Sequence, residues 1–398
     1  MENQKTVVLG VCGGIAAYKL ADLASKLSKE QYDVHVIMTK NATEFITPLT
    51  FETLTGNKCI VDTFDRDFQW DVKHISLAKR AALALIAPAT ANVIAKLANG
   101  IADDMLTTTV LAMKCPVLVS PSMNTAMYEH PATQRNMETL RSYGYRLIEP
   151  ESGVLACKDV GKGRLPKTEV LYEEIRQVLA YPKDLAGKQV LVTAGPTQES
   201  VDPVRYLTNH STGKMGYEIA RAAYLRGAEV TLVTGPCHLP PPYGVKAVQV
   251  TSAQDMFEAV KAEADTSDII IKAAAVADFT PAEKAAEKIK KQGRKTAQIN
   301  LRATTDILKY LGEHKHEGQL LCGFSMETEQ MLEHSREKLL RKNADMIVAN
   351  SLRQQGAGFG GDTNIVTLIT RQDETALPQM SKEMVAHAVL DKLLTFGK

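Results

Sequence analysis

Short apolar runs rich in Val, Ile and Leu alternate along the chain with segments whose apolar residues recur at helical spacing. In the first half, residues 6–11, 33–39, 82–88 and 116–122 have the composition of buried parallel strands. Residues 15–30, which follow the first run, carry apolar positions at the spacing of an amphipathic helix. Strands that alternate with helices in this way predict an α/β fold built on doubly wound parallel sheets.

The pattern pauses at the segment YPKDLAGK, residues 181–188, which contains Pro182 and Gly187. At 398 residues the chain is longer than one hydrophobic core usually supports. We therefore predict two Rossmann-like domains of similar size, 1–182 and 188–398. In the second domain, strands are expected over residues 189–195, 228–235, 268–276, 319–325, 344–350 and 364–370.

Composition and charge narrow the class of protein. The formal net charge is +1, which argues against a polyanion-binding surface and so against a nucleic-acid partner. The six cysteines lack metal-ligand spacing, and we expect reduced thiols of a cytoplasmic protein rather than a zinc site or disulfides. The uncharged stretch 81–95 is too short to span a membrane. Gly10, Gly13 and Gly14 favour a strand–turn–helix start over a signal peptide.

Two glycine-containing loops lie where a strand leads into a helix, a position that suits a phosphate. The first, GVCGGIAAY from residue 10, departs from the dinucleotide fingerprint GxGxxG at Cys12 and Ile15. It suits a mononucleotide phosphate or only a tight turn. The second, TNHSTGKMGYEIA from residue 208, fails as a Walker A loop at Thr208 and Met215. It predicts a phosphate cradle of another kind or a capped helix start.

A run of cations occupies the segment from residue 281 to 297. Such a run is either a solvated face or a lid whose lysines close over a polyphosphate. Its basic residues are Lys284, Lys288, Lys290, Lys291, Arg294 and Lys295.

A single cysteine stands among glycines and cations in SGVLACKDVGKGRL, residues 152–165. No CxxC motif surrounds Cys157. From the residues alone, Cys157 is a small buried side chain, half of a disulfide, a metal ligand or a proton donor.

Ten segments in order nevertheless match one family. The chain resembles the bifunctional phosphopantothenoylcysteine decarboxylase/phosphopantothenate–cysteine ligases of coenzyme A biosynthesis, and the resemblance runs through nearly the whole chain. In the first half it rests on GGIAAYK, KHISL, APATANVIAKLANGIADDMLT, PSMNTAMY and SGVLACKDVGKGRL. In the second half it rests on TAGPTQESVDPVRYLTNHSTGKMG, AAAVADF, EKIKK, GFSMET and RKNADMIVAN.

For the first domain the resemblance implies a flavodoxin-like decarboxylase that binds FMN. Cys157 matches the family's active-site cysteine, which protonates the substrate in the reductive step. The family usually has glycine after this cysteine, where this chain has Lys158. His74 matches an essential histidine, and Asn124 matches the asparagine that binds the substrate carboxylate. The FMN-binding positions implied are Gly13, Thr39, Thr90, Asn92, Asp104 and Thr107.

For the second domain the resemblance implies a ligase that uses CTP and Mg²⁺. Asn209 matches the residue tied to an acyl-cytidylate, and Arg205 is expected to meet a substrate phosphate or carboxylate. Lys288 matches the first lysine of the family's KIKK motif, so the resemblance favours a lid over a solvated face for the cation run. Asp278 is expected near the nucleotide and the metal ion. The remaining CTP-binding positions implied are Ala273, Ala274, Thr305, Asp306, Ile307, Leu308, Phe324, Lys338 and Lys342.

The expected substrates are 4′-phosphopantothenate, cysteine and CTP. By resemblance we also expect a homo-oligomer, with flavin domains in trimers grouped into a dodecamer and ligase domains in dimers. A flavin-binding regulatory subunit is the alternative in another class, but such a protein is expected to lack the proton donor or the ligase residues. A nicotinamide-dependent oxidoreductase would need the dinucleotide fingerprint, which is absent.

Overall fold

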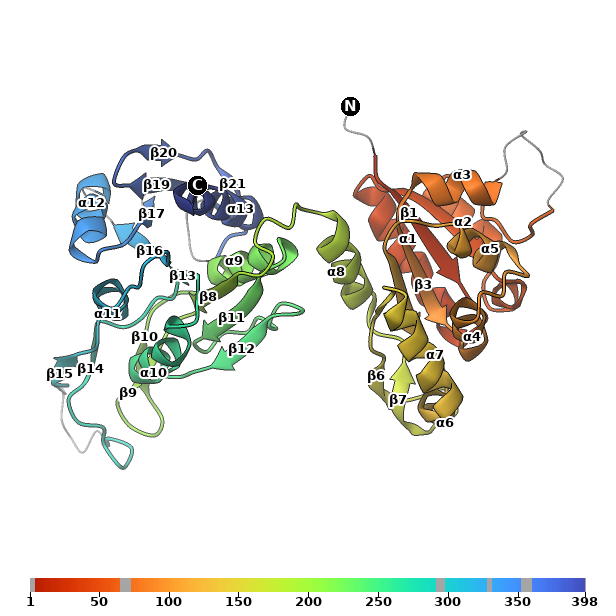
Figure 1. Ribbon diagram of the computed structural model, residues 1–398. Helices are drawn as coiled ribbons and strands as arrows, with labels where there is room; N and C mark the ends of the chain where they lie inside the picture. The colour runs from red at the N-terminus through yellow and green to blue at the C-terminus, as the bar shows by residue number, and fades with distance from the viewer. Residues whose placement is uncertain (1–3, 65–72, 291–297, 328–330, 352–359, 398) are drawn as a thin grey trace. The chain divides into compact units, whose positions relative to one another are not determined.

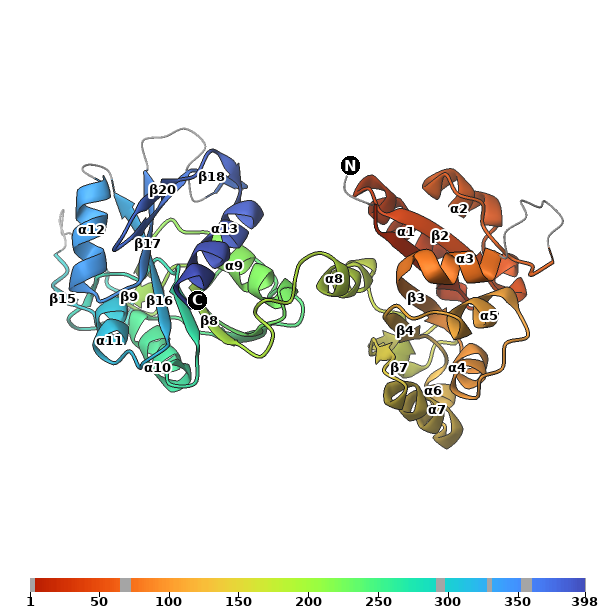
Figure 2. The same cartoon turned by 45° about the horizontal axis from the view of Figure 1, so that its top comes forward.

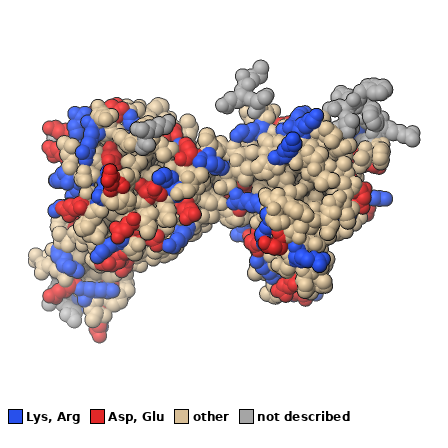
Figure 3. Space-filling view, in the orientation of Figure 1, with Lys and Arg blue, Asp and Glu red and all other residues tan. Residues whose placement is uncertain are grey.

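The computed structural model describes residues 4–64, 73–290, 298–327, 331–351 and 360–397. The chain forms two compact units, Met1–Tyr181 and Pro182–Lys398, and each is described by itself (Figure 1). Within the described part of the chain, no helix is both long enough and apolar enough to cross a membrane. Basic and acidic side chains are interspersed on the face of each unit shown in Figure 3, as the near-zero net charge leads one to expect.

Unit 1 is built on a five-stranded parallel sheet. Its strands lie in the order β2-β1-β3-β4-β5, the flavodoxin-like order of a doubly wound fold. The four strands predicted from the sequence are confirmed. Their bounds, with that of the short edge strand β5, are β1 Thr6–Val11, β2 Asp33–Met38, β3 Ala81–Ala89, β4 Val117–Pro121 and β5 Arg146–Leu147.

Helices cover both faces of this sheet because strand side chains point alternately to either side. Val7 and Leu9 of β1 pack with α1, α2 and α8, whereas Val8 packs with α3, α4, α5 and α7. The helix predicted over 15–30 begins with one 3₁₀ turn, Ile15–Tyr18, before α1. The helices are α1 Lys19–Lys29, α2 Pro48–Thr55, α3 Lys73–Arg80, α4 Ala91–Ala98, α5 Met105–Leu111, α6 Thr125–Glu129, α7 Pro131–Ser142 and α8 Thr168–Leu179. A second 3₁₀ turn spans Lys40–Glu44.

An antiparallel hairpin, β6 Glu151–Val154 and β7 Val160–Arg164, carries the cysteine motif. The sequence did not predict this hairpin. Strand β7 lies beside α6 (Figure 1), and the backbone N–H of Met123 donates to the carbonyl of Gly163 at 3.0 Å. A Cβ on Gly163 would lie 2.2 Å from the Met123 carbonyl oxygen, and one on Gly161 would lie 2.5 Å from Thr125 Oγ1. The two glycines therefore permit the close approach of β7 to the turn after β4.

Unit 2 contains an eight-stranded sheet in the order β12-β11-β8-β13-β16-β17-β19-β20. The first six strands are parallel and follow a Rossmann order, and β19 and β20 extend the sheet in antiparallel fashion. All six predicted strands of this half are found. The bounds are β8 Gln189–Ala194, β11 Glu229–Thr234, β12 Lys246–Gln249, β13 Ile269–Lys272, β16 Leu320–Glu327, β17 Met346–Ser351, β19 Val366–Thr370 and β20 Glu374–Ala376.

Figure 2 shows helices on both sides of this sheet, and two separate apolar clusters fill the space between. On one side lie α9 Lys214–Leu225 and α13 Lys382–Leu394; on the other lie α10 Ala253–Ala264, α11 Ile307–Glu313 and α12 Met331–Arg341. The short antiparallel pairs are β9 Gln198–Ser200 with β10 Tyr206–Thr208, β14 Phe279–Pro281 with β15 Leu301–Ala303, and β18 Thr363–Asn364 with β21 Met380–Ser381. A 3₁₀ turn, Thr395–Gly397, follows α13.

Candidate functional sites

In unit 1, three predicted cofactor residues and the predicted substrate-binding Asn124 follow the carboxyl ends of neighbouring parallel strands, where ligands of doubly wound folds bind. Gly13 follows β1, Thr39 follows β2, Thr90 follows β3 and Asn124 follows β4. Because these strands are adjacent in the sheet, the four residues lie along one edge of it.

Two hydroxyls near this edge lack a hydrogen-bond partner among the described residues. They are Thr39 Oγ1 and Ser120 Oγ, and both are buried. A Cβ on Gly13 would lie 2.5 Å from Cβ of Asn41, so the β1 loop fits tightly against the β2 loop only with glycine there. Unpaired buried hydroxyls beside a tight strand–helix loop fit a bound phosphate or polar ring system.

Three of the other predicted cofactor residues, Thr90, Asp104 and Thr107, have structural partners. Thr90 caps α4, with its hydroxyl accepting from Val93 N–H at 3.3 Å, and Asn92 is exposed on the first turn. Asp104 and Thr107 form a capping box at the start of α5, which uses both side chains.

Cys12 lies beside this edge but is a poor candidate for chemistry. Burial, and to a smaller extent the Asp104 charge, raises the pKa of the Cys12 thiol to about 12. Cys12 therefore stays a neutral packing residue at physiological pH.

At the tip of the hairpin the structure brings Cys157 to Asn124. The Asn124 amide donates to Cys157 Sγ at 3.2 Å and to the Asp159 carboxylate at 2.8 Å, and the thiol itself donates to that carboxylate at 3.2 Å. Cys157 and Asp159 are exposed and Asn124 is half-buried, so a substrate can reach the thiol from solvent. The sequence predicted Asn124 and Cys157 as site residues but did not single out Asp159. The available signal was its position, since Asp159 is a carboxylate two residues after the cysteine.

The hairpin is held in place by ion pairs at its base. Lys162 pairs with Glu149 at 2.7 Å, Arg141 pairs with the same carboxylate at 3.0 Å, and Tyr128 donates to it at 3.1 Å. Lys162 is thus engaged away from the thiol. Lys158, the residue that replaces the family's glycine, has φ +69°, in the left-handed region that favours glycine.

His74 stands near the start of α3 and is half-buried. The eight residues before that helix, 65–72, lie outside the described part of the chain. None of the described contacts joins His74 to Cys157 or Asn124, so its predicted role stays a prediction.

In unit 2, a cavity of about 460 Å³ lies at the carboxyl ends of the central strands. Six of the predicted ligase residues line it: Asn209, Ala273, Ala274, Asp278, Phe324 and Lys338. The loop Ser211–Gly216, which leads into α9, lines it as well. The arrangement matches the place where Rossmann-like folds bind nucleotides.

The glycines of this loop act through packing. Gly213 has φ +81°, and a Cβ on Gly216 would lie 2.6 Å from Cβ of Ala194. Gly216 therefore lets α9 approach β8 closely. Lys214, which invited a Walker A reading, pairs with Asp362 at 2.7 Å.

Asn209 is oriented by the backbone that follows β13. Its amide donates to the carbonyls of Ala275 at 3.0 Å and Val276 at 3.4 Å, and this leaves the side-chain oxygen without a partner among the described residues. Asp278 likewise has no side-chain partner in the described ranges.

Two lysines of α12 and its C-terminal end lie beside the cavity. Lys338 donates to the Phe324 carbonyl at 3.1 Å, and Lys342 forms an ion pair with Asp306, the N-cap of α11. Ile307 and Leu308 of that helix are buried in the core, so only their backbone is available to a ligand.

The remaining predicted residues of unit 2 do not line this cavity. Arg205 pairs with Asp202 and donates to the Ile289 carbonyl at 2.9 Å, which places it next to the exposed Lys288. Asp202 accepts several hydrogen bonds, with that of Arg205 dominant, and its pKa is held far below the usual range. Thr305 lines a separate polar cavity of about 560 Å³. The predicted lid residues Lys291, Arg294 and Lys295 lie outside the described residues.

Two cavity residues were missed by sequence reasoning. Asn350, at the end of β17, is 4% exposed, and its Oδ1 has no partner in the part of the chain that is described. Lys272 ends β13 and lines the same cavity. Its signal was a lone lysine within the apolar run DIIIKAAAV.

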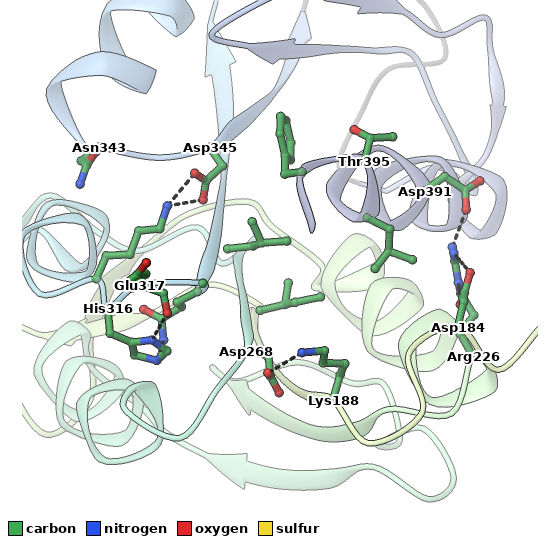
Figure 4. A pocket seen from close by; sticks show the side chains of 17 residues that line it. Asp184, Lys188, Arg226, Asp268, His316, Glu317, Asn343, Asp345, Asp391 and Thr395 are labelled. Carbon is green, nitrogen blue, oxygen red and sulfur yellow. Dashed lines mark hydrogen bonds and ion pairs between the residues drawn. The ribbon is translucent and has the colours of Figure 1, made fainter. Parts of the chain in front are cut away.

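A larger cavity, about 1030 Å³, lies at the opposite, amino ends of the unit 2 strands (Figure 4). Its basic side chains are engaged in ion pairs: Lys188 with Asp268 at 2.9 Å, Lys315 with Asp345 at 2.6 Å and Arg226 with Asp391 at 2.7 Å. None of the predicted ligase residues lines this cavity. Its ion pairs connect different segments of unit 2, which is a structural role.

A metal site made by protein side chains alone is not found: the described residues contain no group of three or more His, Cys, Asp and Glu that could hold an ion. Mg²⁺ usually takes only one or two protein carboxylates and fills its other positions with phosphate oxygens and water. The unpartnered Asp278 fits that donor set.

Two family models match the chain. The model described as Flavoprotein matches residues 1–180, and the model described as DNA/pantothenate metabolism flavoprotein C-terminal domain matches residues 185–396. With two doubly wound α/β units that match these two models, the protein is thus a two-domain flavoprotein.

Relatives with known names extend along the whole chain. The coenzyme A biosynthesis bifunctional protein CoaBC of Bacillus subtilis is 49% identical over 403 residues, covering 100% of this chain and 98% of the relative. That of Vibrio cholerae is 44% identical over 387 residues, with 97% of each covered. A crystal structure of the C-terminal domain of a CoaBC protein is 45% identical and covers 53% of this chain and 96% of its own, with a TM-score of 0.46.

The chain belongs to the family of coenzyme A biosynthesis bifunctional proteins. It is an enzyme.

Proposed function

We propose that this enzyme catalyses two consecutive steps of coenzyme A biosynthesis. Unit 2 condenses 4′-phosphopantothenate with cysteine at the expense of CTP, and unit 1 then decarboxylates the product to 4′-phosphopantetheine. The observation that carries the proposal is the contact between Asn124 and Cys157, two residues 33 positions apart whose side chains meet at an exposed site. The match of unit 1 to flavoproteins supports FMN as its cofactor.

The decarboxylation needs a temporary change in the substrate, because loss of CO₂ from an N-acylated cysteine leaves a carbanion with no electron sink. Bound FMN would supply the reversible two-electron oxidation of the thiol-bearing carbon that this change requires. The resulting C=S group stabilises the carbanion as an enethiolate, which must be protonated on carbon.

The residues of unit 1 divide this work. Thr39, Thr90, Ser120 and Gly13 would hold the cofactor at the strand ends. The Asn124 amide, which donates to Cys157 and Asp159 in this structure, would exchange one of these hydrogen bonds for one to the substrate carboxylate before it leaves as CO₂. Cys157 then gives its proton to the enethiolate. Asp159, which accepts hydrogen bonds from both side chains, orients them.

The ligase step requires a leaving group on the carboxylate of 4′-phosphopantothenate. Attack on CTP forms an acyl-cytidylate and releases pyrophosphate, and the amine of cysteine then displaces CMP. In unit 2, Asp278 would bind Mg²⁺ on the triphosphate, and the free Asn209 oxygen and the cavity lysines would hold the acyl-cytidylate. Arg205 and Lys288, which lie together outside the cavity, would reach the phosphates from a closing segment.

We further propose that the enzyme works in the cytoplasm as a homo-oligomer, with trimers of unit 1 and dimers of unit 2. The exposed position of Arg205 and Lys288 supports a site that is completed on assembly.

The intact purified chain provides the test. We expect a bound chromophore that is released as FMN, and conversion of 4′-phosphopantothenate to 4′-phosphopantetheine only when CTP, Mg²⁺ and cysteine are all present. A chain that holds no flavin even after incubation with FMN would contradict the decarboxylase assignment.

Two substitutions should separate the activities. Cys157→Ser should retain FMN and ligase activity but lower the output of 4′-phosphopantetheine at least 100-fold, a loss typical of a missing general acid. Asn209→Asp should abolish ligation but spare decarboxylation of supplied phosphopantothenoylcysteine. Cys115→Ser and Asn300→Asp, at positions outside both sites, are the matched controls. Equal loss of both activities in either site variant would contradict two independent sites.

A further inference from the structure

Lys272 occupies an unusual position for a lysine. It ends β13, a central strand of the unit 2 sheet, opposite Thr193 of β8 and Gly323 of β16. Because side chains alternate along a strand, Lys272 projects to the same side as Ile270, which packs in the cluster under α10, α11 and α12. Lys272 is half-buried, and it lines the cavity of about 460 Å³.

The Lys272 ammonium has no hydrogen-bond or ion-pair acceptor among the residues that the structure describes. The charged groups whose electrostatic interaction with Lys272 is strong enough to affect its pKa are Lys338 and Lys342 from α12 and its C-terminal end, Asp306 from the start of α11 and Asp278 from the loop after β13. Asp306 is already paired with Lys342. Lys272 thus shares the cavity lining with three other lysines, Lys214, Lys338 and Lys382, whereas Asp278 is the carboxylate among the lining residues.

This environment disfavours a positive charge on Lys272. Burial is the main cause and the Lys338 charge the next, and together they lower the pKa of Lys272 to about 8. An oxyanion bound in the cavity would supply the missing acceptor and reverse both effects, since it pairs with the ammonium and screens the neighbouring lysines.

We propose that Lys272 binds a phosphoryl oxyanion of the ligase substrates and takes up a proton when it does so. The inference rests on the proposed ligase function and adds to it a charged residue at the floor of the cavity. Two sources carry the required group, the phosphates of CTP and the phosphate of 4′-phosphopantothenate, and binding measurements on each ligand distinguish them.

Isothermal titration calorimetry of the full chain at pH 8 tests the proposal. Lys272→Met removes the charge but keeps the length of the side chain, and we expect it to weaken Kd about tenfold for whichever ligand meets Lys272. Lys272→Arg, which retains a cation, should recover part of that loss. Lys261→Met, an exposed change of equal charge on α10, should leave both affinities unchanged.

Proton uptake on ligand binding distinguishes the proposed role of Lys272 from a merely structural one, which would not change it. Titrations in two buffers of different ionisation enthalpy should show net uptake of protons by the wild type and much less by Lys272→Met. The wild-type measurement needs no variant to fold. Unchanged affinity for both ligands, or wild-type binding without proton uptake, would overturn the role of Lys272. Failure of the wild type to bind either ligand would instead overturn the proposed ligase function.

Discussion

At the scale of single residues, the surroundings of a side chain determine its role more than the residue type does. Cys12 and Cys157 are both lone thiols beside the unit 1 site, yet Cys12 is fully buried and Cys157 is exposed against Asn124 and Asp159. The sequence identified Cys157 because its motif resembled a family. It could not show that the thiol donates to Asp159, because that contact depends on the conformation of the turn 155–159.

Lys272 and Asn350 were missed for a related reason. Each ends an apolar strand, and a strand pattern shows that a polar residue is out of place without showing what it faces. The positions of the strand ends could be predicted, whereas the cavity between them depends on packing among α9, α12, α13 and the loops.

The same lysine should leave a signature in stability. In the unfolded chain a lysine has a pKa of about 10.4, whereas in the folded protein Lys272 has a pKa of about 8. The unfolded state therefore binds more protons between these values, and the Lys272 contribution to stability becomes more favourable as pH rises through that window.

We therefore expect Lys272→Met to be more stable than the wild type at pH 7.5, by on the order of 1 kcal/mol, and to lose that advantage by about pH 10. Urea unfolding of both proteins across this range measures the difference and cancels the titration of other groups. A difference in stability that stays constant with pH would contradict the lowered pKa of Lys272. Lys261→Met should show no such trend.

At the scale of elements, the hairpin β6–β7 decides whether unit 1 has an active site. Its strands were not predicted because glycines and lysines give β7 no apolar alternation. In the structure, Gly161 and Gly163 allow β7 to pack against the turn that carries Asn124.

Gly163→Ala should move the hairpin that carries Cys157 away from the turn that carries Asn124. The added Cβ would meet the Met123 carbonyl, and φ +145° is unfavourable for alanine, so β7 must move away. We expect decarboxylation to fall more than tenfold while ligation stays near the wild-type rate. Gly153→Ala on β6 is the matched control, because its Cβ would make only ordinary contacts with Arg164, the nearest at 3.5 Å. Comparable losses in both variants would show that the hairpin tolerates neither change for reasons other than docking.

At the scale of the whole molecule, each of the four apolar clusters draws its residues from one unit only. The boundary predicted at residues 181–188 coincides with this separation of the cores. Pro182 and Gly187 interrupt the strand–helix alternation there, between the two sets of core residues.

Calorimetric unfolding of the intact chain should therefore show two transitions. A ligand stabilises only the unit that binds it, by about 2.7 kcal/mol at a concentration a hundredfold above Kd. FMN should raise the midpoint of one transition and CTP with Mg²⁺ the midpoint of the other. A single transition that both ligands shift equally would contradict independent cores.

The position of α8 has a consequence for how the protein is made. Leu171, Tyr172, Ile175 and Leu179 of this helix complete the core that faces β1 and α1, and α8 is the last element of unit 1. Every strand of the unit 1 sheet is therefore synthesised before the helix that completes the cover that α1 and α2 provide on one of its faces. On the ribosome, the nascent chain exposes part of that apolar face until about the first 180 residues have emerged, and only then can unit 1 complete its folding ahead of unit 2.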